Sequence, residues 1–313
     1  MASNLFSAIL FMVFSLSFSQ TSKDGKIFLD STWSETTEAN HKYYRIIKDY
    51  YSDKDSYKIY DYFKSGVLQM VGTSKFKDHI QKEGPFVYYY ENGNKESIET
   101  YVNGTQTGKQ YYWYQNGNKK SEIHYFTDIE TKSPTYNIIQ YWDINGNQKL
   151  VNGNGEYEIE SDDLHEIGTL VKSLKHGTWK GKITSAKHSF IEKYEEGNLI
   201  SGISTDSNGI NYSYTSLTTA GGPKKGLKHF YFFISRNFMK PKEAKTNNFI
   251  GTVYLTFTIE KEGSASNIEV IRKVGYGIDE EAVRLVKRYK GWTPFKRKGI
   301  IEPVLYSLPI KIK

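Results

Sequence analysis

The histidines are the residues of this chain that could most readily bind a metal ion, but their spacing argues against such a site. They occupy positions 41, 79, 124, 165, 176, 188 and 229 of the 313 residues. No two of them are four residues apart and no H-E-x-x-H sequence occurs, although a helix needs that spacing to point two imidazoles at one zinc ion. The sequence therefore predicts no metal site.

The residues that could act as nucleophiles or bind phosphate and calcium are also poorly arranged for those tasks. Cysteine is absent, which excludes disulfides, thiolate ligands and a cysteine nucleophile, and no serine stands in a G-x-S-x-G turn. The glycines of residues 153–155 precede a strand-like segment rather than the helix of a phosphate-binding loop. The acidic residues between 158 and 163 lack calcium-loop spacing, and we interpret them as a solvated edge. We expect a non-enzymatic protein without catalytic residues or cofactors.

The first large part of the chain is repetitive and is predicted to be β-sheet. Aromatic residues make up 15% of the sequence and tyrosine accounts for 26 residues, a composition that favours strands. The sequence GPFVYYYENGNK at residues 84–95 is matched by GKQYYWYQNGNK at residues 108–119, and degenerate copies lie at 62–66, 141–146 and 190–197. A regular period indicates stacked units that bury a face against their neighbours.

Each repeat is predicted to be a β-hairpin. Asn-Gly lies between two aromatic runs, and both residues accept the positive φ angles of a two-residue turn. The Tyr and Trp positions would then form a ladder of cross-strand contacts that builds the core. The alternative is that exposed aromatic residues of the ladder bind glycan or another protein.

The end of the chain, residues 250–313, alternates differently. Two segments with period-two apolar residues predict strands around residues 252–259 and from residue 268, with a turn at residues 260–263 between them. A helix follows, with Asp279 as its expected cap and Gly291 as its stop. One helix face carries Ala282, Leu285, Val286 and Tyr289. A last strand alternates through Val304, Tyr306, Leu308, Ile310 and Ile312.

This strand-strand-helix-strand unit resembles the C-terminal domain of the TonB family. The matching residues occur in the family's order and spacing: Pro241, Gly251, Val253, Phe257, Gly263, Ala282, Trp292, Thr293, Pro294, Gly299, Tyr306, Ser307, Leu308, Pro309 and Ile310. The hairpin repeats, from about residue 57 to 202, resemble bacterial MORN-type repeats. The fold class is therefore mostly β with a C-terminal α+β domain.

The TonB resemblance implies a partner-binding edge. In that family the equivalent last strand lies where a short receptor segment adds as a further strand, so we expect Val304, Tyr306, Leu308 and Ile310 to contact a partner. The residues Trp292, Pro294, Gly263 and Ala282 are expected to be structural. Energised members of the family carry a proline-rich spacer, whereas only Pro85 and Pro134 precede the Gly221-Gly222-Pro223 boundary here. The missing spacer argues against direct energy transduction, and the resemblance still implies partner binding.

Positive charge is concentrated in the C-terminal part. From residue 224 onward there are 19 Lys and Arg residues against 8 Asp and Glu residues, a net charge of +11. An exported chain rarely meets nucleic acid, so we expect anionic lipid headgroups, lipopolysaccharide or an acidic protein face as partners of this surface. The alternative is a solvated helix end whose basic residues match the helix dipole.

The N-terminal residues predict export. Residues 1–20 are apolar and end in small residues at Ser17 and Ser19, which is typical of a cleaved signal. The apolar run of residues 5–18 is shorter than the roughly 20 residues that cross a bilayer, and an uncleaved anchor is the alternative. We expect a signal at 1–19, a polar segment at 20–56, the repeats at 57–220, a linker at 221–229 and the TonB-like domain at 230–313.

The leading functional hypothesis is an exported binding protein of the periplasm or cell envelope of a Gram-negative bacterium. It would recognise a segment of an outer-membrane receptor by strand addition in transmembrane transport. One alternative is a scaffold whose repeats hold peptidoglycan or the envelope while the end domain forms a homodimer. Another is a toxin-immunity protein, because similar repeats occur in such proteins.

Overall fold

A computed structural model describes residues 24–248 and 250–312. The predicted export signal, residues 1–19, lies outside the described residues. The chain divides into two compact units, residues 1–148 and residues 149–313. None of the helices in the described part is long and apolar enough to span a membrane.

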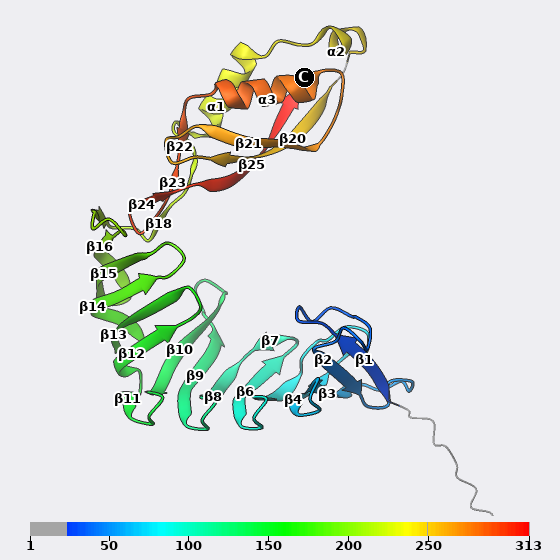
Figure 1. Ribbon diagram of the computed structural model, residues 1–313, viewed down its shortest axis with the longest axis vertical. Helices are drawn as coiled ribbons and strands as arrows, with labels where there is room; N and C mark the ends of the chain where they lie inside the picture. The colour runs from blue at the N-terminus through cyan, green and yellow to red at the C-terminus, as the bar shows by residue number, and fades with distance from the viewer. Residues whose placement is uncertain (1–23, 249, 313) are drawn as a thin grey trace, which may run out of the picture. The chain divides into compact units, whose positions relative to one another are not determined.

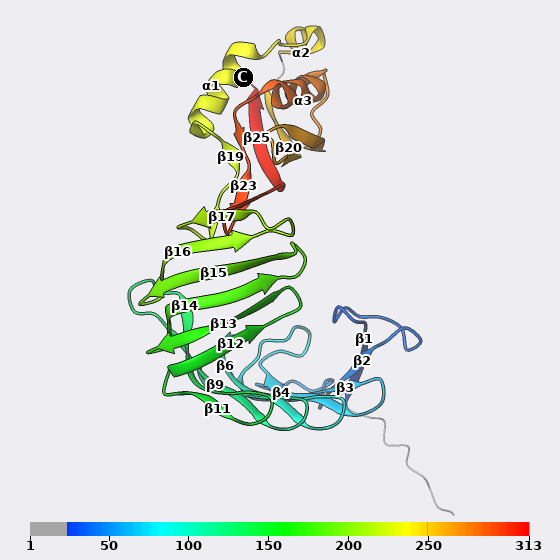
Figure 2. The ribbon, with the colours of Figure 1, turned by 60° about the vertical axis from the view of Figure 1, so that its left-hand side comes forward.

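The first unit is an antiparallel sheet in which each strand pairs with its neighbours in the chain (Figure 2). Its strands are β1 (Gly25–Leu29), β2 (Tyr43–Ile47), β3 (Tyr57–Phe63), β4 (Leu68–Ser74), β5 (Gly84–Tyr89), β6 (Lys95–Val102), β7 (Thr105–Gln106), β8 (Gly108–Trp113), β9 (Lys119–Thr127) and β10 (Pro134–Trp142). The short β7 pairs with the end of β6. The predicted hairpins and the predominance of strand are confirmed.

The second unit begins with a further run of antiparallel hairpins. Its strands are β11 (Gln148–Val151), β12 (Asn154–Glu160), β13 (Leu164–Val171), β14 (Leu174–Ile183), β15 (His188–Glu195), β16 (Asn198–Thr205) and β17 (Asn211–Tyr214). In β15 the residues alternate strictly between buried and exposed, as expected for a sheet with one covered face.

Aromatic side chains of the repeats lie over glycines on the neighbouring strand. Phe86 covers Gly72 so closely that a Cβ atom there would lie 2.3 Å from the Phe86 ring. The same arrangement recurs at Gly168 under Trp179, Gly181 under Phe190, and Gly202 under Tyr214. Any side chain at these glycines would displace the ring, so the aromatic ladder builds the core, as the sequence predicted. Figure 2 shows the strands that carry these pairs in the second unit, β13 to β17.

The hairpin turns are of two kinds, and the prediction for the principal Asn-Gly turns was wrong. At residues 90–94 and 114–118 only the glycine, Gly93 or Gly117, has a positive φ angle. There the amide of Gly93 donates to Tyr90 and the amide of Tyr90 donates to Asn94, which makes a type I turn followed by a glycine bulge. The expected turn, with both residues at positive φ, occurs instead at Asn103-Gly104, Asn152-Gly153 and Glu196-Gly197.

Polar side chains of these turns tie each repeat to the next. The Tyr90 hydroxyl donates to the carbonyl oxygen of Trp113 at 2.9 Å, and the Asn92 amide donates to that of Gln115 at 2.8 Å. One repeat later the corresponding pairs are Tyr114 with Trp142 at 3.0 Å and Asn116 with Ile144 at 3.0 Å. The repeated Tyr-x-Asn-Gly-Asn sequence therefore stacks the turns as well as closing them.

The second unit ends in an α+β domain (Figure 1). Its helices are α1 (Gly226–Asn237), α2 (Lys242–Thr246) and α3 (Ile278–Arg288). Its main sheet has the order β21-β20-β25, from β20 (Gly251–Ile259), β21 (Ala265–Arg272) and β25 (Val304–Ile312). Short strands β18 (Thr218–Thr219), β19 (Gly222–Pro223), β22 (Trp292–Thr293), β23 (Phe295–Arg297) and β24 (Ile300–Glu302) complete it. The predicted order of strand, strand, helix and strand is confirmed.

One face of this sheet is covered by helices and forms the core. Val253, Leu255, Phe257 and Ile259 of β20 are buried, as are the four predicted residues of the helix face, Ala282, Leu285, Val286 and Tyr289. The prediction that Asp279 caps the helix was wrong, because α3 begins after Gly277 and its first turn has no side-chain cap. Asp279 instead accepts hydrogen bonds from the amides of Val274 and Gly275 at 2.9–3.2 Å, which fixes the loop before the helix.

Candidate functional site

Strand β25 lies at one edge of the C-terminal sheet. It pairs with β20 over nine consecutive residues, from Val304 to Ile312, without a register shift. The opposite edge strand, β21, shifts register against β20 at two places, and such bulges disturb the regular edge that an added strand requires. Within the described chain no strand pairs with the outer side of β25. The regular edge of the sheet is therefore the β25 edge.

The main chain of β25 faces outward at alternate residues. The hydroxyl of Tyr231, in α1, donates to the carbonyl oxygen of Pro309 at 2.7 Å. Since proline has no N–H to give to β20 and its carbonyl meets α1, we place the main chain of Pro309 on the outer side. By alternation, Leu305 and Ser307 also face outward. Among the described residues, their main chains make no hydrogen bond outside the ladder with β20.

The side chains of the predicted partner-binding residues lie on the face of the sheet that packs against the core. Leu308 and Ile310 are buried in the core, while Val304 and Tyr306 are partly buried against it. Their side chains are thus committed to the fold, and partner contact at these residues stays a prediction. Sequence reasoning missed Leu305, whose side chain is 70% exposed on the open face of the sheet. Pro309 cannot donate a hydrogen bond to β20, and Leu305 lies four residues before it on the same strand. This spacing was the signal that could have identified Leu305 as outward-facing.

The predicted structural residues lie at the base of this sheet. Trp292 is buried, and its ring centroid lies 4.8 Å from that of Phe257 and 4.9 Å from that of Tyr289. Gly263 has a φ angle of 81°, and a Cβ atom there would lie 2.8 Å from the carbonyl oxygen of Trp292. Glycine is therefore required at 263 by both conformation and space. Ala282 is fully buried and Pro294 is half-buried.

The hairpin of β23 and β24 joins this domain to the last repeats, which sequence reasoning did not foresee. Lys298, at its tip, places its ammonium group 2.5 Å from the carboxylate of Glu192, which is fully buried in β15. The hydroxyls of Tyr194 and Tyr214 donate to the same carboxylate at 3.0 and 2.7 Å. The Lys298 ammonium also lies 3.7 Å from the centre of the Phe190 ring. Burial, followed by the hydrogen bond to Glu192, raises the pKa of Tyr214.

A cleft of about 620 Å³ lies beside this junction. It is lined by residues of the last repeat turns and of the β23–β24 hairpin, among them His188, Asp206 and Arg297. His188 is buried, and neither ring nitrogen has a hydrogen-bond partner among the described residues. Burial, with Arg297 nearby, lowers the pKa of His188. The lining mixes both signs of charge and includes no grouping of described His, Asp and Glu residues that could hold a metal ion.

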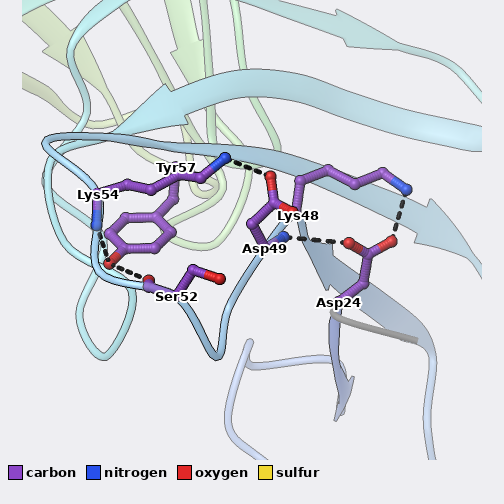
Figure 3. A network of polar contacts seen from close by, with 6 residues as sticks. All are labelled: Asp24, Lys48, Asp49, Ser52, Lys54 and Tyr57. Atoms are coloured by element: carbon purple, nitrogen blue, oxygen red, sulfur yellow. Dashed lines mark hydrogen bonds and ion pairs between the residues drawn. The ribbon is translucent and has the colours of Figure 1, made fainter. Parts of the chain in front are cut away.

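A separate polar network organises the start of the first unit (Figure 3). Asp24 accepts from the Lys48 ammonium at 2.6 Å and from the amide of Asp49 at 3.1 Å, and the bond from Lys48 is the main reason that the pKa of Asp24 is lowered. The hydroxyl of Tyr57 donates to the carbonyl oxygen of Ser52 at 2.9 Å. These contacts fix the loop between β2 and β3.

Comparison with known proteins assigns the C-terminal part of the chain. Residues 241–312 match the family model for the Gram-negative bacterial TonB protein C-terminal domain. This range contains β20, β21, α3 and β25, so the resemblance seen in the sequence is supported for this domain. The match does not include the hairpin repeats. No curated protein matches the chain.

Proposed function

We propose that this protein binds an extended segment of an outer-membrane receptor by strand addition along β25, as a TonB-like component of transport across the cell envelope. The observation that carries the proposal is the uninterrupted edge strand with outward main-chain groups at Leu305 and Ser307, in the domain that matches the TonB family model. Strand addition uses main-chain hydrogen bonds for affinity and alternate side chains for selection.

Only part of the β25 edge is available for pairing with an added strand. At its C-terminal half, the Tyr231 hydroxyl already occupies the carbonyl oxygen of Pro309, and proline supplies no donor. The outward groups at Leu305 and Ser307 remain for an incoming strand. An added segment would therefore pair mainly with the first half of β25, over about four to five residues by the spacing of an antiparallel or parallel ladder.

Side chains beside this half of the edge favour an apolar or hydroxylated segment. On the open face Leu305 lies opposite Thr258, and Ser307 lies opposite Thr256. Alternate side chains of an added strand would pack beside Leu305 and Ser307. The only charged side chain of the described β25 residues is that of Lys311, near the other end of the strand. Leu305 would then provide the main apolar contact, with burial of its exposed side chain contributing to affinity.

In this proposal the hairpin repeats are the scaffold that carries the binding domain in the envelope. The contact between Lys298 and Glu192 supports that role, because it fixes the β23–β24 hairpin to β15 by a buried ion pair. The repeats replace the proline-rich spacer of energised family members. We propose a periplasmic or envelope location for the chain on the same grounds.

Amide hydrogen exchange tests strand addition directly. The full chain is compared with and without a synthetic peptide from the periplasmic N-terminal segment of an outer-membrane transporter. We expect exchange to slow at the amides of Leu305 and Ser307, while those of Leu308 and Ile310, already paired with β20, change little. Protection confined to β21 or to the hairpin repeats would contradict the proposal.

A further inference from the structure

A second surface of the C-terminal domain combines positive charge with aromatic residues. It is a groove of about 370 Å³ between the start of α1 and the end of α3. Its rim carries Lys224, Lys225, Arg288 and Lys290, and its floor is formed by His229, Phe233 and Tyr289. Figure 1 shows α1 beside the end of α3 that leads to β22.

The two sides of the groove are held together by the fold. The amide of Lys224 donates to the carbonyl oxygen of Gly291 at 2.7 Å, and the rings of Phe233 and Tyr289 lie 5.1 Å apart. Arg288 is the last residue of α3, while the three lysines of the rim lie in the segments directly next to α1 and α3. The hydrogen bond of Lys224 and the burial of Tyr289 against the core therefore hold these segments beside the helices.

The charge of this surface is not neutralised within the described chain. None of the residues that line the groove is acidic, and none of its four cations takes part in an ion pair with a described carboxylate. Four unpaired cations around one groove repel one another, so an anionic partner would be bound with little competition from the protein's own carboxylates.

An apolar residue stands on the same side of α1. Phe232 is 58% exposed, and the guanidinium of Arg236 lies 5.2 Å from its ring centre. His229, Phe232, Phe233 and Arg236 have the spacing of one helix face, so Phe232 and Arg236 continue the groove along α1. Exposed aromatic and basic residues together are typical of a surface that enters the headgroup region of a membrane, whereas an acidic protein partner would need only the charges.

We propose that this groove and the adjoining face of α1, defined by Lys225, Phe232, Arg236, Arg288 and Lys290, dock on an anionic phospholipid surface. The cations would meet headgroup phosphates, and the Phe232 ring would enter the boundary between headgroups and acyl chains. This contact is separate from the β25 edge and would hold the domain beside the membrane while that edge stays open.

Vesicle co-sedimentation of the full chain tests the proposal. Vesicles of phosphatidylcholine alone are compared with vesicles that also contain phosphatidylglycerol, at low and at high salt. We expect binding only to the anionic vesicles, and we expect salt to weaken it because the charges are exposed. Equal binding to both kinds of vesicle, or to neither, overturns the proposal.

Two variants separate charge from insertion. The triple variant Lys225→Gln, Arg288→Gln and Lys290→Gln is expected to weaken binding by roughly tenfold or more. A matched triple variant on the exposed face of the repeats, Lys180→Gln, Lys182→Gln and Lys193→Gln, should bind as the parent does. If both triple variants lost the same amount of vesicle binding, the overall charge of the chain would explain the binding, and the assignment to the groove would be overturned.

The variant Phe232→Ser tests the membrane as the partner. It leaves every charge in place and alters a side chain that is mostly outside the core, so the fold should be retained. We expect weaker binding to anionic vesicles, with the same dependence on salt as in the parent chain because the charges are unchanged. Undiminished vesicle binding by Phe232→Ser would show that the attraction between charges alone accounts for the binding, and it would overturn the proposed docking with an inserted ring.

Discussion

The ammonium group of Lys298 lies 2.5 Å from the carboxylate of Glu192, and these residues are 106 positions apart in the chain. The contact resembles one inside the repeats, where the Lys175 ammonium lies 2.6 Å from Glu166 and 4.2 Å from the centre of the Trp179 ring. In the earlier hairpin the lysine comes from the repeat itself, whereas Glu192 in the last repeats receives its lysine, Lys298, from the C-terminal domain. Arrays of repeats need such an end cap.

Removing this lysine should destabilise the second unit strongly. The variant Lys298→Met leaves the fully buried carboxylate of Glu192 without its counter-charge, which costs about 3–5 kcal/mol when one partner of a buried pair is removed. Urea unfolding of the full chain measures the loss. Lys296→Met, at an exposed position of the same hairpin, should have little effect, and adding Glu192→Gln to Lys298→Met should recover part of the stability.

Trp292 is expected to hold the C-terminal core together. Its ring contacts Phe230, Phe257 and Tyr289, with centroid distances of 5.1, 4.8 and 4.9 Å. Trp292→Ala should lower the free energy of unfolding of this domain by about 3–5 kcal/mol through lost burial and a cavity. Amide exchange in β20 and β25 of the full chain reports the change, and Trp292→Phe should cost less. Unaltered exchange in Trp292→Ala would show that the ring is dispensable.

The sequence predicted features that depend on local pattern. Strand alternation located β20 and β25, and the helical spacing of Ala282 and Leu285 identified the buried face of α3. The repeat of aromatic and Asn-Gly segments identified the hairpins. Each of these signals lies within one strand, one helix or two neighbouring hairpins, where side-chain periodicity follows from the backbone itself.

Features that depend on distant contacts were not predicted. Lys298 and Glu192 are 106 positions apart, and neither has a distinctive local sequence. The outward direction of the β25 main chain follows from the contact between Tyr231 and Pro309, 78 positions apart. Asp279 was predicted to be the cap because caps are recognised by residue type, but Gly277 occupies the cap position and Asp279 binds the preceding loop.

Acid should weaken the contact between α3 and the end of α1 through Glu281. Burial alone would raise the pKa of Glu281, but hydrogen bonds from Arg284 and from the amide of Met239 outweigh it, and the pKa is lowered. A lowered folded pKa means that the stabilisation is complete above the unfolded value, about 4.3, and is lost as the pH falls through the folded value.

The variant Glu281→Gln should therefore be less stable at neutral pH and should lose less stability below about pH 5 than the parent chain. Urea unfolding at a series of pH values measures both effects. Glu280→Gln, at the adjacent exposed position, is the matched control. An identical pH dependence in Glu281→Gln and the parent would remove Glu281 from the acid response.

Protonation of His188 should cause a second loss of stability as the pH falls, at a higher pH than the loss caused by Glu281. Its pKa is lowered by burial and then by Arg297, so the unfolded chain takes up this proton first, from about pH 6.5 downward. His188→Phe removes two unpartnered nitrogens and should abolish this loss without lowering stability at neutral pH. The exposed His176→Phe should keep the loss, as measured by thermal unfolding between about pH 7 and 5.

Strand addition makes its sharpest prediction at Ser307. Ser307→Pro removes an N–H that faces outward, so β25 should stay paired with β20 while an added strand loses one donor. Leaving a partner carbonyl unsatisfied costs about 1–3 kcal/mol, which corresponds to roughly fivefold to 150-fold weaker binding. Ser307→Ala keeps the N–H and should bind the receptor peptide as the parent does. Proline at Tyr306 would not test the outer edge, because the N–H of Tyr306 faces β20. Peptide titration measures the affinities, and amide exchange in β20 verifies the fold. Undiminished binding by folded Ser307→Pro would remove this edge as the site of addition.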